Sequence, residues 1–557
     1  MIILGIADNH DSGAALVIDG RLVGAVNQER IDRKKNSGAF PWGAIDQLLK
    51  DHQVAYRDIH RICVGTAFTP SALLRQYPSS HTTAKKSGQF SILLHGYMLY
   101  QSMLRRSGLH IYEIEACKKV LKARLKERPF ETTDIKLWDH HQAHAEAAYR
   151  TQPRAEILVL TLDAMGDGLS ATAWHGRSGD IRKLWDQSGL ASINLFYSRI
   201  TEILGFTPLR HEGKVTGLAA YAPPPEELIR HFEKEIAFKD GKFKRFSYKI
   251  PAAKNDAFWR VCQDYSKEII AAAAQTVLEK AVLDFVQYWI EQTGLRDIAV
   301  AGGIFANVKL NQRIANLPDL NSLWVLPHMG DGGLAVGAAL ASADAPPLQL
   351  QNAYLGFTPS RDDNFRALKR NKLPRQNTKV MERAVNCLAN GGVIARCSGG
   401  LEWGPRALGN RSIFAVPSDP GLNDTLNQRL QRTEFMPFAP IVRDCDADKY
   451  FLGLEKISEA ARFMTVCVDC TAEFKQKAPA AVHVDGTARP QILREQDNPE
   501  VYELLGRVGV KTGIPILLNT SFNIHEEPIV CTADDAVRAF LSSGLEGLWL
   551  GEFFVEK

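Results

Sequence analysis

The chain lacks the features that mark membrane, secreted and general nucleic-acid-binding proteins. None of its apolar runs reaches the ~20 residues that a helix needs to cross a bilayer. Its first residues, Met1 to Asp8, read as a buried strand without the basic start and cleavage site of a signal peptide. The net charge is only +4 for 557 residues, although local arginine clusters could still bind small anions. We expect a cytoplasmic protein with no membrane and no nucleic-acid partner.

The cysteines do not indicate a disulfide framework. There are nine, an odd number, scattered along the chain, as expected for free thiols in a reducing compartment. Cys467 and Cys470 have CxxC spacing, but no second pair accompanies them and they lie in an alternating Val/Cys run. We interpret this run as a strand with one buried face rather than a zinc site.

The length is too great for a single hydrophobic core and predicts two or three domains. The stretch Ala343 to Pro347 reads Ala-Asp-Ala-Pro-Pro and has the composition of a boundary. We therefore predict one domain over residues 1–345 and a second over 346–557.

A strand–polar turn–strand pattern occurs twice in the first domain. It begins with strands at Ile2–Ile6 and Ala14–Ile18 around a glycine turn, followed by an Asp-Gly hairpin and a third strand. It recurs at Ile157–Leu162 and Leu169–Trp174, around the turn Asp163–Gly168. Duplication of this kind is typical of the actin, hexokinase and Hsp70-like class, in which two α/β halves clamp a nucleotide.

The same domain contains a glycine turn suited to a nucleotide. A helical stretch at Ser266–Thr293 leads to a strand at Ile298–Val300, the Gly302-Gly303 turn and a helix from about Phe305. Glycines at this point let backbone amides approach a phosphate closely. A further helix of small residues is expected at Gly332–Ala341.

Two histidines and two turn carboxylates could form a metal site. His140 and His144 are four residues apart, so on a helix they would share one face. Asp163 and Asp331 each stand in a glycine-rich turn, and such a mixed N/O set suits iron, manganese or zinc. The alternative is that the histidine spacing is a coincidence on a surface helix and that Asp163 belongs to a plain hairpin turn.

The second domain contains clusters of arginine with glycine, proline, serine and asparagine. Fixed guanidinium groups beside small donors are what oxyanion or phosphate recognition needs, although most arginines form surface ion pairs. The clusters are Trp403–Ser412, Arg429–Pro440, Asp485–Gln491 and Leu518–Asn523.

Together these motifs resemble the O-carbamoyltransferases of the group that contains the nodulation-factor, cephem and tobramycin enzymes. The shared motifs occur in family order over nearly the whole chain: HDSGAAL, HHxxH with DxxGDG, VAGGIFANVKLN, GDGG, EWGPRALGNRS, PFAP, GTARPQ and NTSFN. The resemblance implies an α/β protein. Its N-terminal domain would be actin-like (the ASKHA class, duplicated RNase H-like), and its C-terminal α/β domain YrdC-like.

The resemblance also implies a reaction. The YrdC-like domain would form carbamoyl adenylate from ATP and carbamoyl phosphate, and the actin-like domain would pass the carbamoyl group to a hydroxyl of a natural product or saccharide. The family's metal is iron, so Fe(II) or another divalent transition metal is expected, with magnesium a further candidate ion. Its ligands carry over by position to His140, His144, Asp163 and Asp331.

The remaining site residues follow from the same resemblance. His10 could take the proton of the acceptor hydroxyl, and Asp11 matches the functional Asp of tRNA-modifying relatives. Relatives usually carry a Lys before PFAP, where this chain has Gln431 and Arg432. The expected nucleotide and phosphate ligands are Lys35, Gly302, Gly303, Asn307, Arg406, Arg411, Arg432, Arg489, Ser521 and Asn523.

Two other functions remain open at this stage. An actin-like sugar kinase would leave the motifs of the second domain unexplained, and the small net charge weighs against a nucleotide-binding tRNA-modification factor. The sequence does not identify the acceptor. It also leaves the oligomeric state open, with a homodimer the commonest outcome for soluble proteins.

Overall fold

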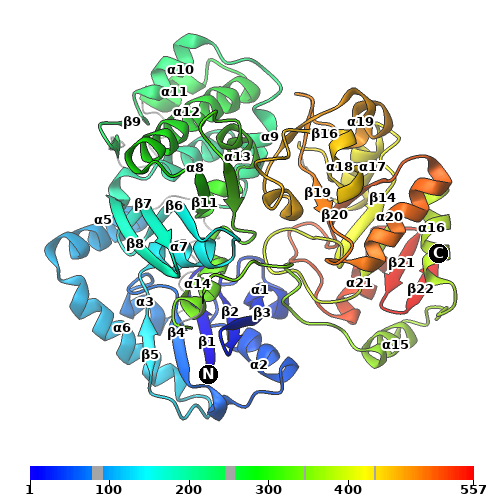
Figure 1. Cartoon of the computed structure of the whole chain (residues 1–557), viewed down its shortest axis with the longest axis horizontal. Coiled ribbons are helices and arrows are strands. Elements are labelled where there is room, and N and C mark those ends of the chain that lie inside the picture. The colour runs from blue at the N-terminus through cyan, green and yellow to red at the C-terminus, as the bar shows by residue number, and fades with distance from the viewer. Residues whose placement is uncertain (78–91, 245–256, 344–345, 432–434, 557) are drawn as a thin grey trace. The chain divides into compact units, whose positions relative to one another are not determined.

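The computed structural model describes residues 1–77, 92–244, 257–343, 346–431 and 435–556, and divides into two units (Figure 1). Unit 1 comprises Met1–Gln28 and Asn36–Leu350, and unit 2 comprises Glu29–Lys35 and Gln351–Lys557. The division at Leu350 lies close to the boundary predicted at 345. The sequence gives no indication that Glu29–Lys35 groups with unit 2, and Arg432 lies outside the described residues.

Unit 1 contains two five-stranded sheets of the same topology. Each has a three-stranded antiparallel meander whose first strand also pairs in parallel with a fourth strand, which pairs with a fifth. This repetition confirms the predicted duplicated α/β architecture. In sheet order, the strands of the first sheet are β3 (Arg21–Asn27), β2 (Gly13–Ile18), β1 (Ile2–Ala7), β4 (Arg61–Val64) and β5 (Ile135–Leu137). Those of the second are β12 (Ser322–Val325), β11 (Asp297–Ala301), β6 (Glu156–Gly166), β7 (Leu169–Arg177) and β8 (Asp180–Ser188).

The central strands of both sheets are continuous apolar runs because helices cover them. A small hairpin, β9 (Phe238–Lys239) with β10 (Lys242–Phe243), lies outside the sheets. The helices of unit 1 are α2 (Trp42–Asp51), α3 (Ala72–Gln76), α5 (Ile92–Ser107), α6 (His110–Leu125), α7 (His140–Arg150), α8 (Asn194–Ile203), α9 (Glu212–Leu218), α10 (Glu226–Glu233), α11 (Ala257–Cys262), α12 (Lys267–Thr293), α13 (Val308–Ala315) and α14 (Leu334–Leu340). Helix α1 (Gln28–Asp32) begins at the last residue before the Glu29–Lys35 segment.

Several predicted elements of unit 1 are confirmed, and the predicted start of one helix is wrong. Helix α12 begins after Ser266, whose side chain caps it, and ends before Gly294 in the left-handed region (φ 71°). The helix expected from Phe305 instead starts at Val308, after the 3-10 turn Gly303–Ala306. Among the described residues, no helix is both long enough and apolar enough to cross a membrane.

Unit 2 is built on a mixed seven-stranded sheet. Helices α16 (Val380–Ala389) and α20 (Pro499–Thr512) pack on it through a core that includes Leu388, Leu504 and Phe414. The strands in sheet order are β19 (Gln491–Leu493), β15 (Ala439–Arg443), β20 (Ile516–Ser521), β14 (Arg411–Ala415), β13 (Ile394–Cys397), β21 (Gly547–Leu550) and β22 (Phe553–Glu556). The helices are α15 (Arg361–Arg370), α16 (Val380–Ala389), α17 (Leu422–Arg429), α18 (Asp444–Tyr450), α19 (Ala472–Lys477), α20 (Pro499–Thr512) and α21 (Ala533–Ser543).

A three-stranded sheet in unit 2 explains the CxxC pair. Its strands are β16 (Phe451–Leu452), β17 (Val468–Cys470) and β18 (Thr487–Ala488). Cys467 and Cys470 are both buried, and all nine cysteines carry free thiols. The predicted strand with one buried face is confirmed for Val468–Cys470, where Asp469 alone is exposed, whereas Cys467 precedes the strand.

Candidate active site

Helix α7 carries both predicted histidine ligands and begins directly after Asp139. One carboxylate oxygen of Asp139 accepts a hydrogen bond from the backbone N–H of Gln142 at 3.1 Å, which caps the helix. The other oxygen accepts from Arg105 Nη1 at 2.6 Å. The fixed helix start places His140 and His144 one turn apart on the same face, as their spacing predicted.

Helix α14, made of small residues, brings Asp331 to the same place. A Cβ atom on Gly337 of this helix would lie 1.8 Å from the carbonyl oxygen of Ala143 in α7. A Cβ on Gly5 in β1 would lie 2.0 Å from the carbonyl oxygen of Ala335. Only glycine allows such close approaches. Because the 3-10 turn that begins at Asp331 runs directly into α14, this packing sets Asp331 opposite α7.

Asp163 lies on strand β6 rather than in the turn that the sequence predicted. Strand β6 continues to Gly166, and its pairing with β7 shifts register between Leu162 and Gly166. Such an irregularity re-aims side chains at the end of a strand. A Cβ on Gly166 would lie 2.0 Å from Cγ of His140, so this glycine leaves room for the imidazole ring.

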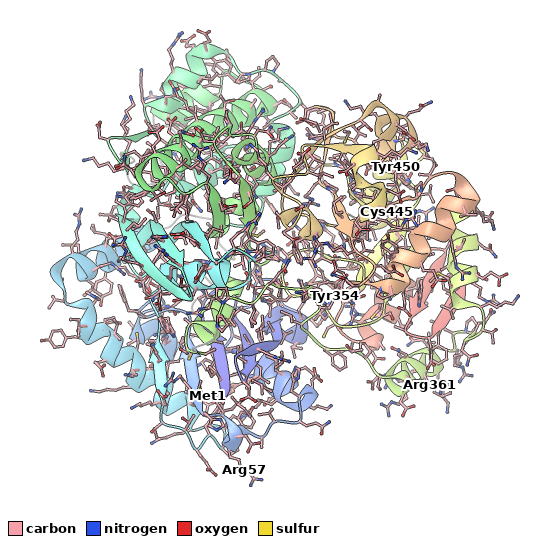
Figure 2. The ribbon with its side chains drawn as sticks, in the orientation of Figure 1. Met1, Arg57, Tyr354, Arg361, Cys445 and Tyr450 are labelled. Atoms are coloured by element: carbon pink, nitrogen blue, oxygen red, sulfur yellow. The ribbon has the colours of Figure 1, made fainter. Side chains whose placement is uncertain are left out.

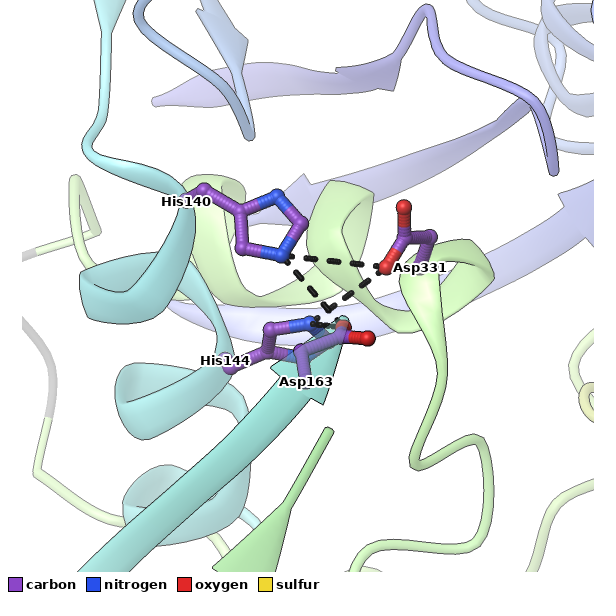
Figure 3. Close-up of side chains that lie close together, drawn as sticks. All are labelled: His140, His144, Asp163 and Asp331. Carbon is purple, nitrogen blue, oxygen red and sulfur yellow. Dashed lines mark hydrogen bonds and ion pairs between the residues drawn. The ribbon is translucent and has the colours of Figure 1, made fainter. Parts of the chain in front are cut away.

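The four predicted ligands converge in unit 1 (Figure 3), and one ligand atom from each lies within 4.8 Å of the others. Asp163 Oδ2 is 3.5 Å from His140 Nε2 and 3.1 Å from His144 Nε2. Asp331 Oδ1 is 3.7 Å from His140 Nε2 and 3.6 Å from His144 Nε2. Ligands about 2.1 Å from one ion stand roughly 3.0–3.4 Å apart, so these separations need only a small contraction.

The chemistry of this donor set also fits a divalent transition metal. His140 Nε2 is buried and has no hydrogen-bond partner among the described residues, although it points at the two carboxylates. Burial lowers the pKa of His140, but Asp331 and then Asp163 outweigh it and raise that pKa to about 9. Burial raises the pKa of Asp163, yet His140 and His144 hold it well below its usual range. The site therefore favours a positive charge, which a proton on His140 supplies when no metal is bound.

His141 does not belong to the ligand set. Its Nδ1 lies 2.7 Å from the hydroxyl of Thr161, and it is not among the four converging ligands. Burial first, and then the charge of His140, lowers the pKa of His141 to about 3. It is therefore a neutral, hydrogen-bonded core residue.

Asp167 supports the site, and no motif in the sequence indicates that role. Its buried carboxylate accepts three backbone N–H groups, from Ala67, Phe68 and His140, each at 2.8 Å. One carboxylate thereby joins the loop after β4 to the first residue of α7. Burial, and then the charge of Asp139, raises the pKa of Asp167.

The first glycine turn places His10 beside the ligand set. His10 Nδ1 lies 3.3 Å from Asp331 Oδ2, and the His10 side chain is 47 % exposed. Asn9 donates to the same Asp331 oxygen at 2.8 Å, which orients the carboxylate so that Oδ1 faces the histidines. The His10 side chain is therefore in contact both with solvent and with one of the four converging ligands.

Asp11 instead contacts the buried side chain of Asn27 and lies near that of His328. Its Oδ1 accepts a hydrogen bond from Asn27 Nδ2 at 3.2 Å, and its Oδ2 lies 4.0 Å from His328 Nε2. The amide oxygen of Asn27 lies 3.0 Å from that same nitrogen. Of the two predicted catalytic residues, His10 is thus the one in direct contact with a ligand carboxylate.

The Gly302-Gly303 turn packs against the end of β6. Gly302 has φ 107°, and a Cβ there would lie 2.0 Å from the carbonyl oxygen of Leu162. A Cβ on Gly303 would stand 3.3 Å from Asp163 Oδ1 and 3.9 Å from Asn194 Nδ2. The turn therefore borders the metal ligands. Asn194, at the start of α8, borders the same turn, and no motif in the sequence marks it.

Asn307 caps a helix and belongs to a buried hydrogen-bond network. Its side-chain oxygen accepts from the backbone N–H of Leu310 at 3.0 Å and caps α13. Its amide nitrogen donates to Gln275 Oε1 at 2.8 Å, and Tyr197 donates to that same oxygen at 2.7 Å. Its predicted role in nucleotide binding stays a prediction.

In unit 2 a buried carboxylate organises the loop that carries Arg406. Glu402 Oε1 accepts the backbone N–H groups of Leu408, Asn410 and Arg411 at 2.8–3.0 Å. Three donors on one anionic oxygen fix the loop in a single conformation. Arg406 itself is only partly buried, so this loop can present it to a ligand.

Side chains from elsewhere in unit 2 hold the same loop from outside. Gln491 donates to the carbonyl of Leu408 at 2.8 Å, and Asn519 donates to that of Ala407 at 3.1 Å. The hydroxyl of Tyr354, labelled in Figure 2, also donates to the Leu408 carbonyl, at 2.7 Å. The GTARPQ and NTSFN motifs thus converge on the EWGPRALGNRS loop.

The predicted phosphate ligands of unit 2 differ in what they contact. Arg411 is fully buried, and its Nη atoms donate to the backbone carbonyls of Ser398, Gly399, Asn410 and Phe357, so it braces the fold. Arg489 and Ser521 are partly exposed near that loop's supporting strands. Asn523 donates to the carbonyls of Ile524 and Glu527 at 3.0 and 2.9 Å, which closes a turn.

The Glu29–Lys35 segment lies against the same loop of unit 2. Arg30 donates to the carbonyl of Gly404 at 2.8 Å. Arg33 donates to the carbonyls of Pro528 and Ile529, each at 2.7 Å. Lys35 at the end of this segment is exposed, so the structure places this predicted phosphate ligand in unit 2, although the sequence assigned it to the first domain.

Solved structures show only distant similarity to this chain. A HypF from T. kodakarensis is 12 % identical over 62 % of this chain and 47 % of its own, with a TM-score of 0.32. A ROK family glucokinase from Streptomyces griseus is 11 % identical over 61 % of this chain and 99 % of its own, with a TM-score of 0.28. These values are too low to support a conclusion about this chain.

Sequence relatives are much closer. Protein MJ1058 of Methanocaldococcus jannaschii is 36 % identical over 76 % of this chain and 74 % of its own length. Nodulation protein NolNO of Sinorhizobium fredii is 30 % identical over 98 % of this chain and 79 % of its own length. Nodulation protein U of Rhizobium tropici is 26 % identical over 94 % and 91 %, respectively.

Two family descriptions cover almost the whole chain. Residues 2–340 match the carbamoyltransferase N-terminus, and residues 385–557 match the carbamoyltransferase C-terminus. The first match contains all four converging ligands and His10, and the second contains the Arg406 loop with the strands that hold it. The chain therefore belongs to the carbamoyltransferase family and is a carbamoyltransferase enzyme.

Proposed function

We propose that this carbamoyltransferase is an ATP-dependent O-carbamoyltransferase that works in two half-reactions. The observation that carries the proposal is the meeting of His10 with a four-residue ligand set in unit 1, at His140, His144, Asp163 and Asp331. Such a centre can activate a hydroxyl and stabilise a leaving phosphate, which carbamoyl transfer requires.

The first half-reaction is assigned to unit 2. Water hydrolyses carbamoyl phosphate to carbamate and phosphate, and a carbamate oxygen attacks the α-phosphorus of ATP. Carbamoyl adenylate forms and pyrophosphate leaves. Arg406, Arg489 and Lys35 are the proposed phosphate ligands, because each is at least partly exposed while Arg411 is committed to backbone carbonyls.

The second half-reaction is assigned to unit 1. His10 takes the proton of the acceptor hydroxyl while the hydroxyl oxygen attacks the carbamoyl carbon. The bond from that carbon to the bridging anhydride oxygen breaks, and AMP leaves with the oxygen. Asn9 holds Asp331 in orientation, and Asp167 holds the start of α7. Fe(II), or another divalent transition metal at the four ligands, would supply positive charge for the developing oxyanion and the departing phosphate.

The acceptor class is proposed as a hydroxyl of a natural product, a saccharide or a related small metabolite. The relatives named as nodulation proteins support an acceptor of this kind. Membership of the carbamoyltransferase family weighs against a sugar kinase and a tRNA-modification factor, the two alternatives that the sequence left open.

Product analysis tests this function. With ATP, carbamoyl phosphate and a panel of hydroxyl compounds, the enzyme should release AMP and pyrophosphate, and one acceptor should gain about 43 Da. Omission of carbamoyl phosphate should abolish both signals. Formation of ADP with a phosphorylated acceptor would identify a kinase and refute the proposal.

A further inference from the structure

Half of the exposed large apolar side chains in the described residues come from one short part of unit 1. Of sixteen such side chains, eight lie between residues 73 and 112. Six of them belong to α5, α6 and the link between these helices. We call these six the hairpin face: Leu99, Tyr100, Met103, Leu109, Ile111 and Tyr112, which are 43–75 % exposed. Scattered apolar side chains are ordinary on a protein surface, but such a concentration marks an interaction site.

The hairpin face comes from two helices that follow one another in the chain. Helices α5 and α6 are joined through Gly108, and Figure 1 draws them at the outer edge of unit 1. Glu113 of α6 braces both neighbouring helices, because its carboxylate accepts from the Tyr100 hydroxyl of α5 at 3.4 Å and from the backbone N–H of Ala72 in α3 at 2.7 Å. All of the apolar side chains except Leu109, which lies in the link, therefore project from braced helices.

Basic residues accompany this face. Helices α5 and α6 contain six basic residues and two acidic ones, an excess equal to the net charge of +4 of the whole chain. Arg105 is bonded to Asp139, whereas Arg106, Lys119 and Lys122 are exposed. Lys119 and Lys122 lie on the same side of α6 as Ile111, at helical spacing, and outnumber Glu115, the one exposed acidic residue on that side.

We propose, against the expectation from the sequence of no membrane partner, that the hairpin face docks the enzyme on an anionic lipid surface. Exposed Leu, Ile, Met and Tyr side chains would enter the headgroup boundary, and the lysines would contact acidic headgroups. A nucleic acid would leave the aliphatic side chains without a partner. A second copy of the chain would bring two positive faces together. The lack of a spanning helix among the described residues does not bear on this mode of binding, because an interfacial helix lies in the membrane plane.

Vesicle co-sedimentation of the full chain tests this inference, independently of carbamoyl transfer. The protein should bind vesicles of phosphatidylcholine mixed with phosphatidylglycerol at about 0.1 M salt and be released at about 1 M salt, where charges are screened. Phosphatidylcholine alone should bind it far more weakly. Each lysine near an acidic surface is worth about fivefold, so Lys119→Glu with Lys122→Glu should weaken binding at least tenfold.

Matched variants separate this face from general surface effects. Ile111→Asp with Tyr112→Asp should also weaken binding at least tenfold, because apolar insertion is lost. Val510→Asp, at a 91 % exposed position of α20, and Lys369→Glu with Lys372→Glu on and beside α15 should bind as the wild type does. Failure of the wild type to bind the acidic vesicles, or equal binding by every variant, would overturn the proposal. A wild-type dimer that Tyr112→Asp dissociates, without vesicle binding, would show instead that the face joins two copies.

Discussion

Replacement of Asp167 by asparagine should weaken unit 1 and its metal site while sparing unit 2. Oδ2 of Asp167 accepts from Ala67 and His140, and Oδ1 accepts from Phe68, all at 2.8 Å and out of contact with solvent. Asparagine has nearly the same shape, but it replaces one acceptor with an N–H₂ group that must face a backbone N–H. A buried N–H without its charged acceptor costs about 1.5–3 kcal/mol, so unit 1 should lose about that much unfolding free energy.

Denaturant unfolding of the wild type and of Asp167→Asn, followed by a probe in unit 1, measures this loss. Asp186→Asn is the matched control, because Asp186 forms a half-exposed pair with Lys183 and its loss should cost at most about 0.5 kcal/mol. Because His140 starts α7, metal affinity should fall in Asp167→Asn, while pyrophosphate release from unit 2 should stay at the wild-type rate. Equal stability of Asp167→Asn and the wild type would refute the role given to Asp167.

Three further predictions concern other parts of the molecule. His10→Asn should lower acceptor carbamoylation by ~10²–10⁴, the usual worth of a general base, and leave pyrophosphate release intact. A parallel fall of both activities would exclude that role. Arg489→Ala should raise the activation free energy of the reaction with carbamoyl phosphate by roughly 1.5–3 kcal/mol and leave the reaction with supplied carbamoyl adenylate unchanged. Equal losses of rate with both donors would show that Arg489 has a structural role. Burial raises the pKa of Glu459, but Arg494 and then Arg462 outweigh it and lower that pKa. Its ion pairs therefore stabilise unit 2 above about pH 4 and are lost as pH falls through the folded-state pKa. Glu459→Gln should be less stable by about 1 kcal/mol at pH 7, and a difference in urea unfolding that persists below that pKa would contradict this assignment.

The sequence predicts best what depends on local spacing. The helical interval between His140 and His144 and the duplicated strand pattern rest on local residue order, and the structure has both. The glycine turn before α14 likewise predicts a tightly packed helix, which Gly337 realises against α7.

Long-range contacts were beyond such reasoning. Asp163 was expected in a turn, but the shifted register between β6 and β7 keeps it on the strand. No local pattern shows that Asp167 receives three backbone amides from two distant segments, or that Glu402 folds its own loop around one oxygen. Arg411 has the composition of a phosphate ligand, yet tertiary packing turns it toward backbone carbonyls.

Metal analysis combined with the two half-reactions tests the central claim most directly. Wild-type enzyme reconstituted with Fe(II) should retain about one ion per chain and lose acceptor carbamoylation, but not pyrophosphate release, when a chelator removes it. His144→Ala removes one of four ligands and should lower metal affinity by about tenfold or more, with carbamoylation from supplied carbamoyl adenylate falling in step. His175→Ala, at a histidine paired with Glu156 near the surface of the same unit, should behave as the wild type does. A wild-type enzyme that transfers the carbamoyl group without bound metal, and is indifferent to chelator, would contradict the account.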